Sequence, residues 1–383
     1  MGPLNGLKIV ELAGIGPSPF AAMLLADLGA TVIRIDRPVP VKLGIDRPLK
    51  FNLLLRNRQN LSLDLKSPAG RNLVLELIDK ADGFIEGFRP GVTERLGLGP
   101  VQCLEKNPRL VYGRMTGWGQ SGPLSQAAGH DLNYIALTGT LGWIGRKDQA
   151  PTPPLNLVGD FGGGGLYLAF GMLAAILEAR NSGIGQVVDA AIIDGAASLA
   201  TSIFGMHAAG LLHERGNNIL DGGAPFYDVY CCRDGRYISI APIEPKFYAE
   251  LCRILRINPE DLGIQNDRSC WPNSKNILAK IFISKDRDEW CNLFEGTDAC
   301  FAPVLDANEV LKHPQLSARQ TFINLDGVVQ PAPAPRFSRS ITDNPTPPKA
   351  ASNASSIEAI TEWLGHEASQ KWLGLINESS QLS

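Results

Sequence analysis

The stretch GLKIVELAGIGPSPFAAMLLADLGATVIRID, residues 6–36, decides the fold. Within it, Leu7–Leu12 and Thr31–Asp36 are short, largely apolar runs of the kind that form buried strands. Phe20–Leu28 lies between them and has the length and composition of a helix. A strand, a helix and a second strand in this order predict a βαβ unit with parallel strands.

The same alternation continues along the chain. Three more strands are expected at Asn60–Leu65, Gly83–Phe88 and Arg109–Met115, with helices at Gly70–Ala81 and near Val101–Lys106. Repeated βαβ units predict a doubly wound parallel sheet. Ligands of such sheets bind beyond the carboxyl ends of the strands. The loops that deserve inspection therefore follow Leu12, Asp36, Leu65, Phe88 and Met115.

Helices dominate the middle of the chain. We expect helices at Asp131–Gly145, at Leu166–Arg180 and from Ala190 to Leu212, and one more strand at Val187–Asp189. The apolar run Leu166–Ala179 is shorter than the roughly 20 residues that span a bilayer, and the last helix contains an aspartate and a histidine, so we interpret both as buried helices and expect no membrane span. Because the last helix is apolar on most faces, it needs a cover, which predicts a two-fold dimer.

The pattern changes near Asp221–Gly223. Tyr227–Cys231 and Tyr237–Ile240, joined by a turn at Asp234–Gly235, predict a hairpin. Helical stretches then continue to about His313, and they belong with the hairpin to a second, smaller domain. Pro331–Pro335 reads as a proline-rich return linker, and one helix is expected at Ile357–Trp372.

The composition excludes several classes of protein. Hydrophobic residues make up 44% and charged residues 20% of the chain, as in folded soluble proteins. The formal net charge of -3 argues against a nucleic-acid-binding protein, which would carry a basic excess. The 7 cysteines are scattered without a CxxC pair, so we expect neither a metal site nor a disulfide framework.

The expected location is the cytoplasm. The N-terminus MGPLNGLKIVEL has no signal-sequence pattern, and the C-terminus QLS is not the SKL peroxisomal address. A scattered set of cysteines suits a reducing compartment. For a eukaryotic protein, a mitochondrial or peroxisomal location stays open.

Four acidic or imidazole side chains are candidates for catalysis. His130 follows a glycine at the start of a predicted helix, where a backbone N–H can stabilise an enolate oxygen and the imidazole can act as a base. Asp131 is a good N-cap for that helix. Asp160 precedes Gly162–Gly165, and four glycines there indicate a close approach to the backbone. Glu244, between two prolines after the hairpin, reads by itself as an exposed loop acid.

Two further features point to a phosphorylated ligand. Gly14-Ile15-Gly16-Pro17 begins like a GxGxxG nucleotide fingerprint, but Pro19 replaces the third glycine, so only an anion site at the following helix is expected. Basic residues follow three strands, where their charges could converge on a phosphorylated carrier: Arg37, Lys66, Arg89 and Arg95.

Four motifs together resemble a known family. GHDLNYIALTG (129–139), PPLNLVGDFGGG (153–164), RPGVTERLG (89–97) and GQVVDAAIIDG (185–195) are similar to the α-methylacyl-CoA racemase branch of the CaiB–BaiF, or class III CoA-transferase, family. The resemblance extends from GLKIVEL (6–12) to PAPRFS (333–338). The GHDLNY and LVGDFGGG motifs are the most specific to the racemase branch.

The resemblance implies an α/β fold with an interlocked dimer. A large Rossmann-like domain with a parallel sheet would be built from both chain ends, and a smaller α+β domain would lie between them. The expected division is 1–189 for the N-terminal part of the large domain, 190–224 for linker helices, 225–313 for the small domain, 314–334 for the return linker and 335–383 for the C-terminal part that completes the large domain.

The resemblance also implies roles for individual residues. His130 and Asp160 would be the acid and base on opposite faces of carbon 2 of a 2-methylacyl-CoA thioester, Glu244 would pair with His130, and Asp131 would help to hold the thioester oxygen. Coenzyme A is then part of the substrate, and no cofactor or metal is implied. Its expected contacts are Ile15, Arg37, Leu63, Asp64, Leu65, Lys66, Gly87, Phe88, Arg89, Arg95, Gly129, Leu132, Asn133 and Tyr134.

Three other functions are open at this point. A CoA transferase on the same fold would use Asp160 as a nucleophile and form an acyl-aspartyl intermediate, but it needs neither His130 nor Glu244. A non-catalytic thioester-binding protein would not need these three side chains. A dinucleotide oxidoreductase is disfavoured because its glycine fingerprint is incomplete.

Overall fold

In the computed structural model, which describes residues 1–39, 41 and 44–380, the chain divides into two compact units. Unit 1 comprises Met1–Thr138, Leu155–Leu199 and Gln320–Ser383, and unit 2 comprises Gly139–Pro154 and Ala200–Arg319. This division assigns residues 139–154 to unit 2 and 190–199 to unit 1, unlike the division expected from the sequence. The last three residues of the expected segment 335–383 lie outside the described residues.

Unit 1 contains a six-stranded sheet in the order β3-β2-β1-β4-β5-β6, with every neighbouring pair parallel. The strands are β1 (Lys8–Leu12), β2 (Thr31–Asp36), β3 (Arg58–Ser62), β4 (Gly83–Glu86), β5 (Val111–Thr116) and β6 (Gln186–Ala191). The strand order reverses between β1 and β4, and a ligand crevice is expected outside the carboxyl ends of these two strands. The predicted α/β fold with a parallel sheet is confirmed.

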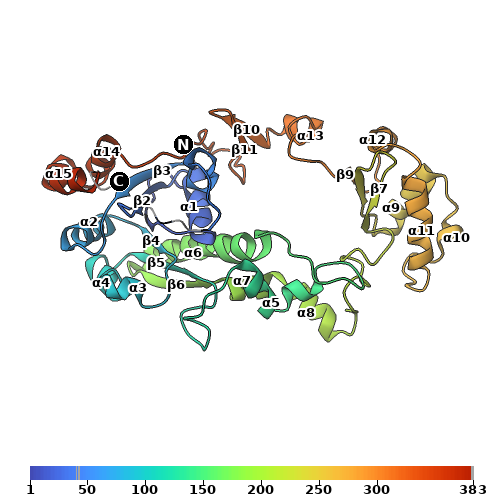
Figure 1. The fold of residues 1–383 in the computed structure, drawn as a ribbon, viewed down its shortest axis with the longest axis horizontal. Coiled ribbons are helices and arrows are strands. Elements are labelled where there is room, and N and C mark those ends of the chain that lie inside the picture. Colours follow the sequence, from blue (N-terminus) through green and yellow to red (C-terminus); the bar gives the residue numbers. More distant parts are fainter. Residues whose placement is uncertain (40, 42–43, 381–383) are drawn as a thin grey trace. The chain divides into compact units, whose positions relative to one another are not determined.

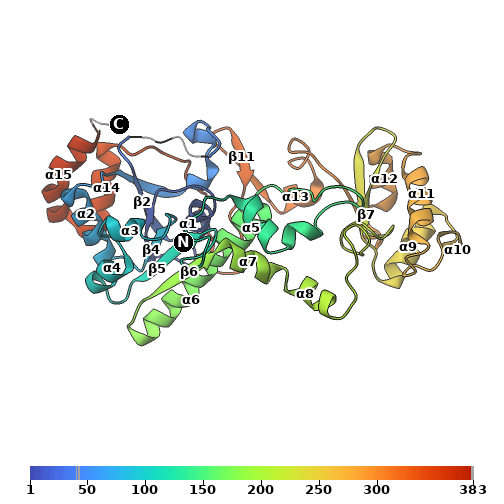
Figure 2. The same ribbon diagram turned by 60° about the horizontal axis from the view of Figure 1, so that its bottom comes forward.

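Helices cover both faces of this sheet, as Figures 1 and 2 show. Side chains alternate along β1, so Ile9 belongs to one apolar cluster while Val10 and Leu12 belong to the other. The cluster around Val10 is covered by α2 (Pro68–Asp79), α4 (Pro100–Lys106), α14 (Asn353–Leu364) and α15 (His366–Ser380). The cluster around Ile9 is covered by α1 (Pro17–Asp27) and α6 (Tyr167–Ser182). Both chain ends thus contribute to unit 1.

Three of the predicted helices are shorter than expected or divided in two. The helix expected at Asp131–Gly145 is α5 (Asp131–Leu137), because Gly139 has a φ of 81° and only a 3₁₀ turn, Thr140–Trp143, follows it. Gly365, with a φ of 90°, divides the expected C-terminal helix into α14 and α15. The long helix expected from Ala190 is two helices, α7 (Ile192–Leu199) and α8 (Thr201–Ala208), and Ala190 itself ends β6.

Strand β3 also differs from its prediction, because it spans Arg58–Ser62 instead of Asn60–Leu65. The chain leaves the sheet after Ser62 to reach the cap of α2, where the Ser67 hydroxyl accepts a hydrogen bond from the Gly70 N–H. Elements without a sequence prediction in unit 1 are α3 (Val92–Arg95), the hairpin of β10 (Phe322–Leu325) and β11 (Val328–Pro331), and the 3₁₀ turns Leu49–Phe51 and Leu53–Leu55.

The expectation that Leu166–Ala179 is too short for a membrane span needs correction. This run belongs to a helical stretch of 26 residues, Leu157–Ser182, which by length and composition alone could cross a bilayer. Its most apolar window is 44% buried inside the protein, and α6 packs on β5 and β6. One side of α6 therefore packs on the sheet of unit 1.

The helix expected at Ala190–Leu212 was predicted to be buried, but its second part, α8, is not buried in this chain. Helix α8 contains no residue that is buried in this chain, although its composition is apolar. On α6, Phe170 and Leu177 are likewise 71% and 65% exposed. These faces lack a cover within the described part of the chain.

Unit 2 is a smaller α+β unit. Its antiparallel sheet has the order β7-β8-β9, and the predicted hairpin is confirmed as β7 (Asp228–Cys231) and β8 (Tyr237–Ile240). Strand β9 (Phe301–Pro303) was not predicted. Buried aromatic residues, among them Phe226, Phe282 and Trp290, form its core. Its helices are α8, α9 (Pro245–Leu255), α10 (Pro259–Leu262), α11 (Trp271–Phe282), α12 (Arg287–Phe294) and α13 (Pro314–Ala318).

Helix α7 approaches the helical turns before α6 at backbone distance. These turns, Leu157–Leu166, are π-helical and contain the four consecutive glycines. A Cβ atom on Gly195 of α7 would lie 1.8 Å from the Gly163 carbonyl oxygen, which is far inside van der Waals contact. A Cβ on Gly163 would lie 2.6 Å from the Ala196 nitrogen. Glycine at both positions is therefore what permits this packing.

Substitution of Gly195 by alanine is expected to destabilise unit 1 by about 1–3 kcal/mol, the usual cost of overpacking a close contact. The matched control is Gly205→Ala in α8, where the added methyl meets no atom within 4 Å among the described residues. Because alanine is the better helix former, the control should be neutral or slightly stabilising. Urea unfolding of both variants measures the difference, and equal stability of the two would contradict the close contact.

Candidate active site

The candidate site lies at the carboxyl edge of the parallel sheet in unit 1. The loop after β1 turns at Gly16, whose φ of 65° and ψ of -119° suit glycine. A Cβ at Gly16 would lie 3.1 Å from Oδ2 of Asp160, so the backbone of this turn lies directly against the carboxylate. The partial glycine motif thus has a definite role, which is to let Asp160 approach the end of β1.

His130 and Asp131 begin helix α5. His130 is the N-cap residue, with extended backbone angles, and its backbone N–H donates to Oδ1 of Asn133 at 3.1 Å. The prediction that Asp131 caps this helix is therefore wrong. Asp131 is the first helical residue, and its buried carboxylate turns away to accept the backbone N–H of Asp160 at 2.6 Å. This bond ties the start of α5 to the segment that carries Asp160.

Asp160 lies within the π-helical segment Leu157–Leu166. π-Helical turns are rare in proteins as a whole, and those that occur are often found at functional sites. The Asp160 carboxylate is partly buried and accepts a hydrogen bond from Nδ2 of Asn156 at 3.3 Å. The neighbouring glycines leave room for α1 and α7, because a Cβ on Gly164 or Gly165 would meet α1 at Pro17 or Phe20.

The pKa of the Asp160 carboxyl reflects its burial and its neighbours. Burial raises the pKa of the Asp160 carboxyl, and the negative charge of Asp131 raises it further. The Asn156 hydrogen bond and the charge of His130 lower this pKa. Burial also raises the pKa of Asp131, against the hydrogen bonds from the backbone of Asp160 and Gly159. The roles of His130 and Asp160 as acid and base stay a prediction.

An aromatic pair, Trp118 and Tyr134, contacts the loop that leads to His130. Tyr134 packs edge-on against Trp118 with ring centroids 4.7 Å apart, and its hydroxyl donates to the Gly129 carbonyl. Gly117 is required beside them, because a Cβ there would lie 2.0 Å from the Tyr134 ring. Burial and the charge of Asp160 raise the pKa of Tyr134, while the charge of Arg89 lowers it. The aromatic pair was not predicted as such, and only its Tyr134 was among the expected contacts.

A pocket of about 320 Å³ opens at the same edge of the sheet, at the ends of β1 to β3. Arg37 and Leu63 of the expected ligand contacts line it, together with the C-terminal segment Lys349–Ala351. The backbone of Lys349 is fixed by a hydrogen bond from Asn60 Nδ2 to its carbonyl at 2.8 Å. No sequence motif pointed to this segment. The expected contacts that are not among the residues lining this pocket are Ile15, Asp64, Leu65, Lys66, Gly87, Phe88, Arg89, Arg95, Gly129, Leu132, Asn133 and Tyr134.

The other expected contacts lie in loops and in the short helices α3 and α5. Phe88 carries the Arg37 guanidinium over its ring at 5.9 Å. Gly87 packs on α1, because a Cβ there would lie 2.4 Å from the Ser18 hydroxyl. Asp64 caps the backbone N–H of Lys66 at 2.9 Å. Arg95 ends the short helix α3, and its guanidinium lies near Gly91. Ile15 and Leu132 are exposed apolar side chains at the ends of the β1 loop and the start of α5.

Glu244 belongs to unit 2 and not to unit 1. It is the exposed N-cap residue of α9, and its carbonyl accepts the backbone N–H groups of Phe247 and Tyr248. Its pairing with His130 stays a prediction. Within the described residues, no group of three or more histidine, cysteine, aspartate or glutamate side chains is placed to hold a metal ion.

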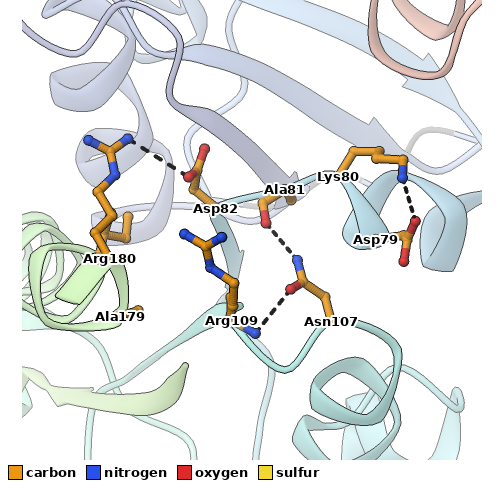
Figure 3. Close-up of a pocket in the computed structure, with 9 residues that line it drawn as sticks. Asp79, Lys80, Ala81, Asp82, Asn107, Arg109, Ala179 and Arg180 are labelled. Carbon is orange, nitrogen blue, oxygen red and sulfur yellow. Dashed lines mark hydrogen bonds and ion pairs between the residues drawn. The ribbon is translucent and has the colours of Figure 1, made fainter. Parts of the chain in front are cut away.

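A second pocket, of about 230 Å³, is unrelated to this site. Figure 3 shows that it lies at the opposite, amino-terminal edge of the sheet. Its charged side chains are largely satisfied by one another, with Arg180 3.9 Å from Asp82 and Lys80 2.9 Å from Asp79. None of the predicted site residues lines it.

Comparison with known proteins gives consistent relatives. The model of CoA-transferase family III matches residues 4–354. Alpha-methylacyl-CoA racemase of Mus musculus is 44% identical over 364 residues, which cover 94% of this chain and 92% of that protein. Alpha-methylacyl-CoA racemase of Homo sapiens is 43% identical over 334 residues, 87% of this chain and 86% of that protein.

A solved structure supports the fold. The crystal structure of a CAIB/BAIF family protein from Brucella suis matches with a TM-score of 0.79 and 26% sequence identity. The match covers 94% of this chain and 99% of that chain.

Proposed function

Because the chain belongs to CoA-transferase family III, we propose that its site is that of a racemase, which interconverts the (R) and (S) forms of a 2-methylacyl-CoA thioester. The protein is then an isomerase that works by acid–base chemistry at carbon 2. The observation that supports this proposal is the hydrogen bond from the Asp160 backbone N–H to the Asp131 carboxylate at 2.6 Å, which joins the segment of Asp160 to the residue that follows His130.

The residues present suit a proton transfer through an enolate. A thioester C–H is weakly acidic, so its removal needs a base close by and donors for the developing oxyanion. One of His130 and Asp160 takes the proton from carbon 2, and the other returns a proton to the opposite face. Their roles exchange with the handedness of the substrate. The N–H of the first residue of an α-helix has no partner inside the helix, so the N–H of Asp131, which begins α5, is proposed to donate to the thioester oxygen.

The carboxylate of Asp131 supports this arrangement through the Asp160 backbone. Its hydrogen bond at 2.6 Å fixes the peptide that carries the second acid–base group. Asp131 is not itself required to exchange a proton. Glu244 is proposed to orient His130, as a carboxylate next to an imidazole does in other acid–base pairs.

Coenzyme A is proposed to bind as a part of the substrate, without a separate cofactor. The pocket of about 320 Å³ offers the positive charge of Arg37 and the C-terminal Lys349 to a phosphorylated carrier. We also propose a homodimer, because the apolar faces of α6 and α8 lack a cover in this chain. A cytoplasmic location is proposed on the ground that all seven cysteines are free.

Incubation of an optically pure 2-methylacyl-CoA in heavy water, without any acceptor acid, tests the function. We expect deuterium to enter carbon 2 while optical purity is lost, because the enolate is reprotonated from solvent-exchanged groups. Mass spectrometry and chiral analysis of the released acid measure both. A reaction that stays silent until a free carboxylic acid is added would instead assign the transferase, in which Asp160 attacks the thioester carbonyl.

A further inference from the structure

A buried carboxylate holds the loop that follows β4. Glu86 is the last residue of β4 and has no exposed surface. One of its oxygens, Oε2, accepts the backbone N–H of Phe88 at 2.7 Å, and Oε1 accepts Nε of Arg114 at 2.9 Å. Arg114 lies on the neighbouring strand β5 and has a second partner in Glu94 at 2.8 Å. The position of the Phe88 backbone is therefore set by a side chain inside the sheet.

Phe88 in turn supports a residue of the ligand pocket. The Arg37 guanidinium lies over the Phe88 ring at 5.9 Å, within the range of a cation–π contact. Arg37 follows β2 and lines the pocket of about 320 Å³, whereas Phe88 follows β4 and does not line it. The Phe88 ring thus packs against the charged guanidinium of Arg37, which comes from another loop.

Burial disfavours the ionised form of the Glu86 carboxyl. Burial raises the pKa of its carboxyl to about 7, against the lowering effects of the Phe88 N–H and of Arg114. Buried ion pairs are weak sources of stability, and apolar residues of similar volume are often as stable. A role beyond stability is therefore the better explanation for Glu86.

We propose that Glu86 is a positioning residue for the ligand: it fixes the Phe88 backbone, and the Phe88 ring then presents Arg37 to a phosphate group of the bound carrier. This inference rests on the proposed acyl-CoA ligand. It does not depend on which reaction follows, because it concerns the binding of the carrier and not the proton transfer at carbon 2.

The test is calorimetric binding of free coenzyme A to the full-length protein. Glu86→Ala should raise the dissociation constant about tenfold, the loss of one well-placed charge-assisted contact. Glu86→Gln keeps an oxygen acceptor for the Phe88 N–H and should stay within about threefold of the wild type. With a thioester substrate, Glu86→Ala should raise KM while kcat changes less than about twofold, because the lost interaction is uniform binding.

A matched control removes a different buried carboxylate from the same unit. Asp27 on α1 is buried and accepts Nε of Arg56 at 3.0 Å, so Asp27→Ala breaks a comparable ion pair. Its affinity for coenzyme A should equal that of the wild type. An equal loss of affinity in Asp27→Ala and Glu86→Ala would overturn the proposal, because general loosening of unit 1 would then explain both.

A double-mutant cycle tests whether Glu86 acts through Arg37. In an Arg37→Ala background, Glu86→Ala should weaken binding less than about twofold, because the side chain that it positions is gone. If Glu86→Ala weakens coenzyme A binding by the same factor in the Arg37→Ala background as in the wild type, the proposal is overturned. Phe88→Leu provides the same test without touching the buried carboxylate, in case Glu86→Ala does not fold. It should lose affinity in the wild-type background and not in the Arg37→Ala background.

The outcomes separate this inference from the proposed function. If the wild type binds coenzyme A and Glu86→Ala binds equally well, only the positioning role is wrong. If the wild type does not bind coenzyme A at all, both fall. If binding behaves as expected but no deuterium enters carbon 2 of a thioester, the positioning role stands and the racemase assignment fails.

Discussion

The His130→Ala variant is expected to racemise a 2-methylacyl-CoA about 10²–10⁴-fold more slowly than the wild type, the usual contribution of one general acid–base group. Its fold should persist, because His130 is exposed and its cap contact with Asn133 uses only backbone N–H. One enantiomer should lose exchange of its 2-hydrogen. The other should still exchange slowly with retention, because Asp160 can remove and return a proton on its own face.

Proton exchange of each separate enantiomer in heavy water, followed by NMR, measures this result. His207→Ala, which changes an exposed histidine of α8 in unit 2, is the matched control and should exchange both enantiomers at the wild-type rate. Wild-type racemisation by His130→Ala would remove the imidazole from the mechanism.

The second prediction concerns Asp160, and it affects the opposite enantiomer from the first. Asp160→Asn should slow racemisation by about 10²–10⁴-fold and abolish exchange for the enantiomer that His130→Ala still exchanges. The amide keeps the shape of the side chain and can still contact Asn156, so the π-helical segment should stay intact. Asp79→Asn at the opposite edge of the sheet is the control and should behave as the wild type. Loss of the same enantiomer in both catalytic variants would place the two groups on one face of the substrate and refute the mechanism.

The pH dependence provides an independent check on Asp160. Burial raises the pKa of its carboxyl, and the charge of Asp131 adds to this effect. The base must be ionised to take a proton, so kcat/KM for the enantiomer that Asp160 deprotonates should fall as the pH drops through this raised pKa. That acidic limb should lie above the usual aspartate range and should vanish in Asp160→Asn. A limb at an ordinary aspartate pKa would contradict the burial of the group.

The local sequence was sufficient to place the parts of the sheet that position the site. The runs Leu7–Leu12 and Thr31–Asp36 are within one residue of β1 and β2, because a buried parallel strand needs a short apolar run and little else. Element ends were less predictable. The end of α5 depends on the left-handed conformation of Gly139, which a helical pattern through that glycine does not reveal.

The candidate site was predictable in its residue types but not in its contacts. His130 and Asp160 stand out by their glycine neighbours and by the family motifs. The hydrogen bond from the Asp160 backbone N–H to the Asp131 carboxylate, however, is a tertiary contact between positions 29 apart. The π-helical turn has no local signal beyond the glycines that permit it. Lys349 lines the pocket only because the C-terminal segment returns to the first half of the sheet. Such contacts depend on packing, which a single sequence does not record.

The discontinuous construction of unit 1 has a consequence for biosynthesis. The apolar cluster around Val10 receives Ile360, Trp363 and Trp372 from α14 and α15, which are made last. During translation, β1 to β6 therefore leave the ribosome with one sheet face covered only by α2 and α4, and all of unit 2 is synthesised before α14 and α15 complete the cover. At about 5–20 residues per second this interval lasts roughly ten seconds or more, during which the nascent chain is a natural client for chaperones.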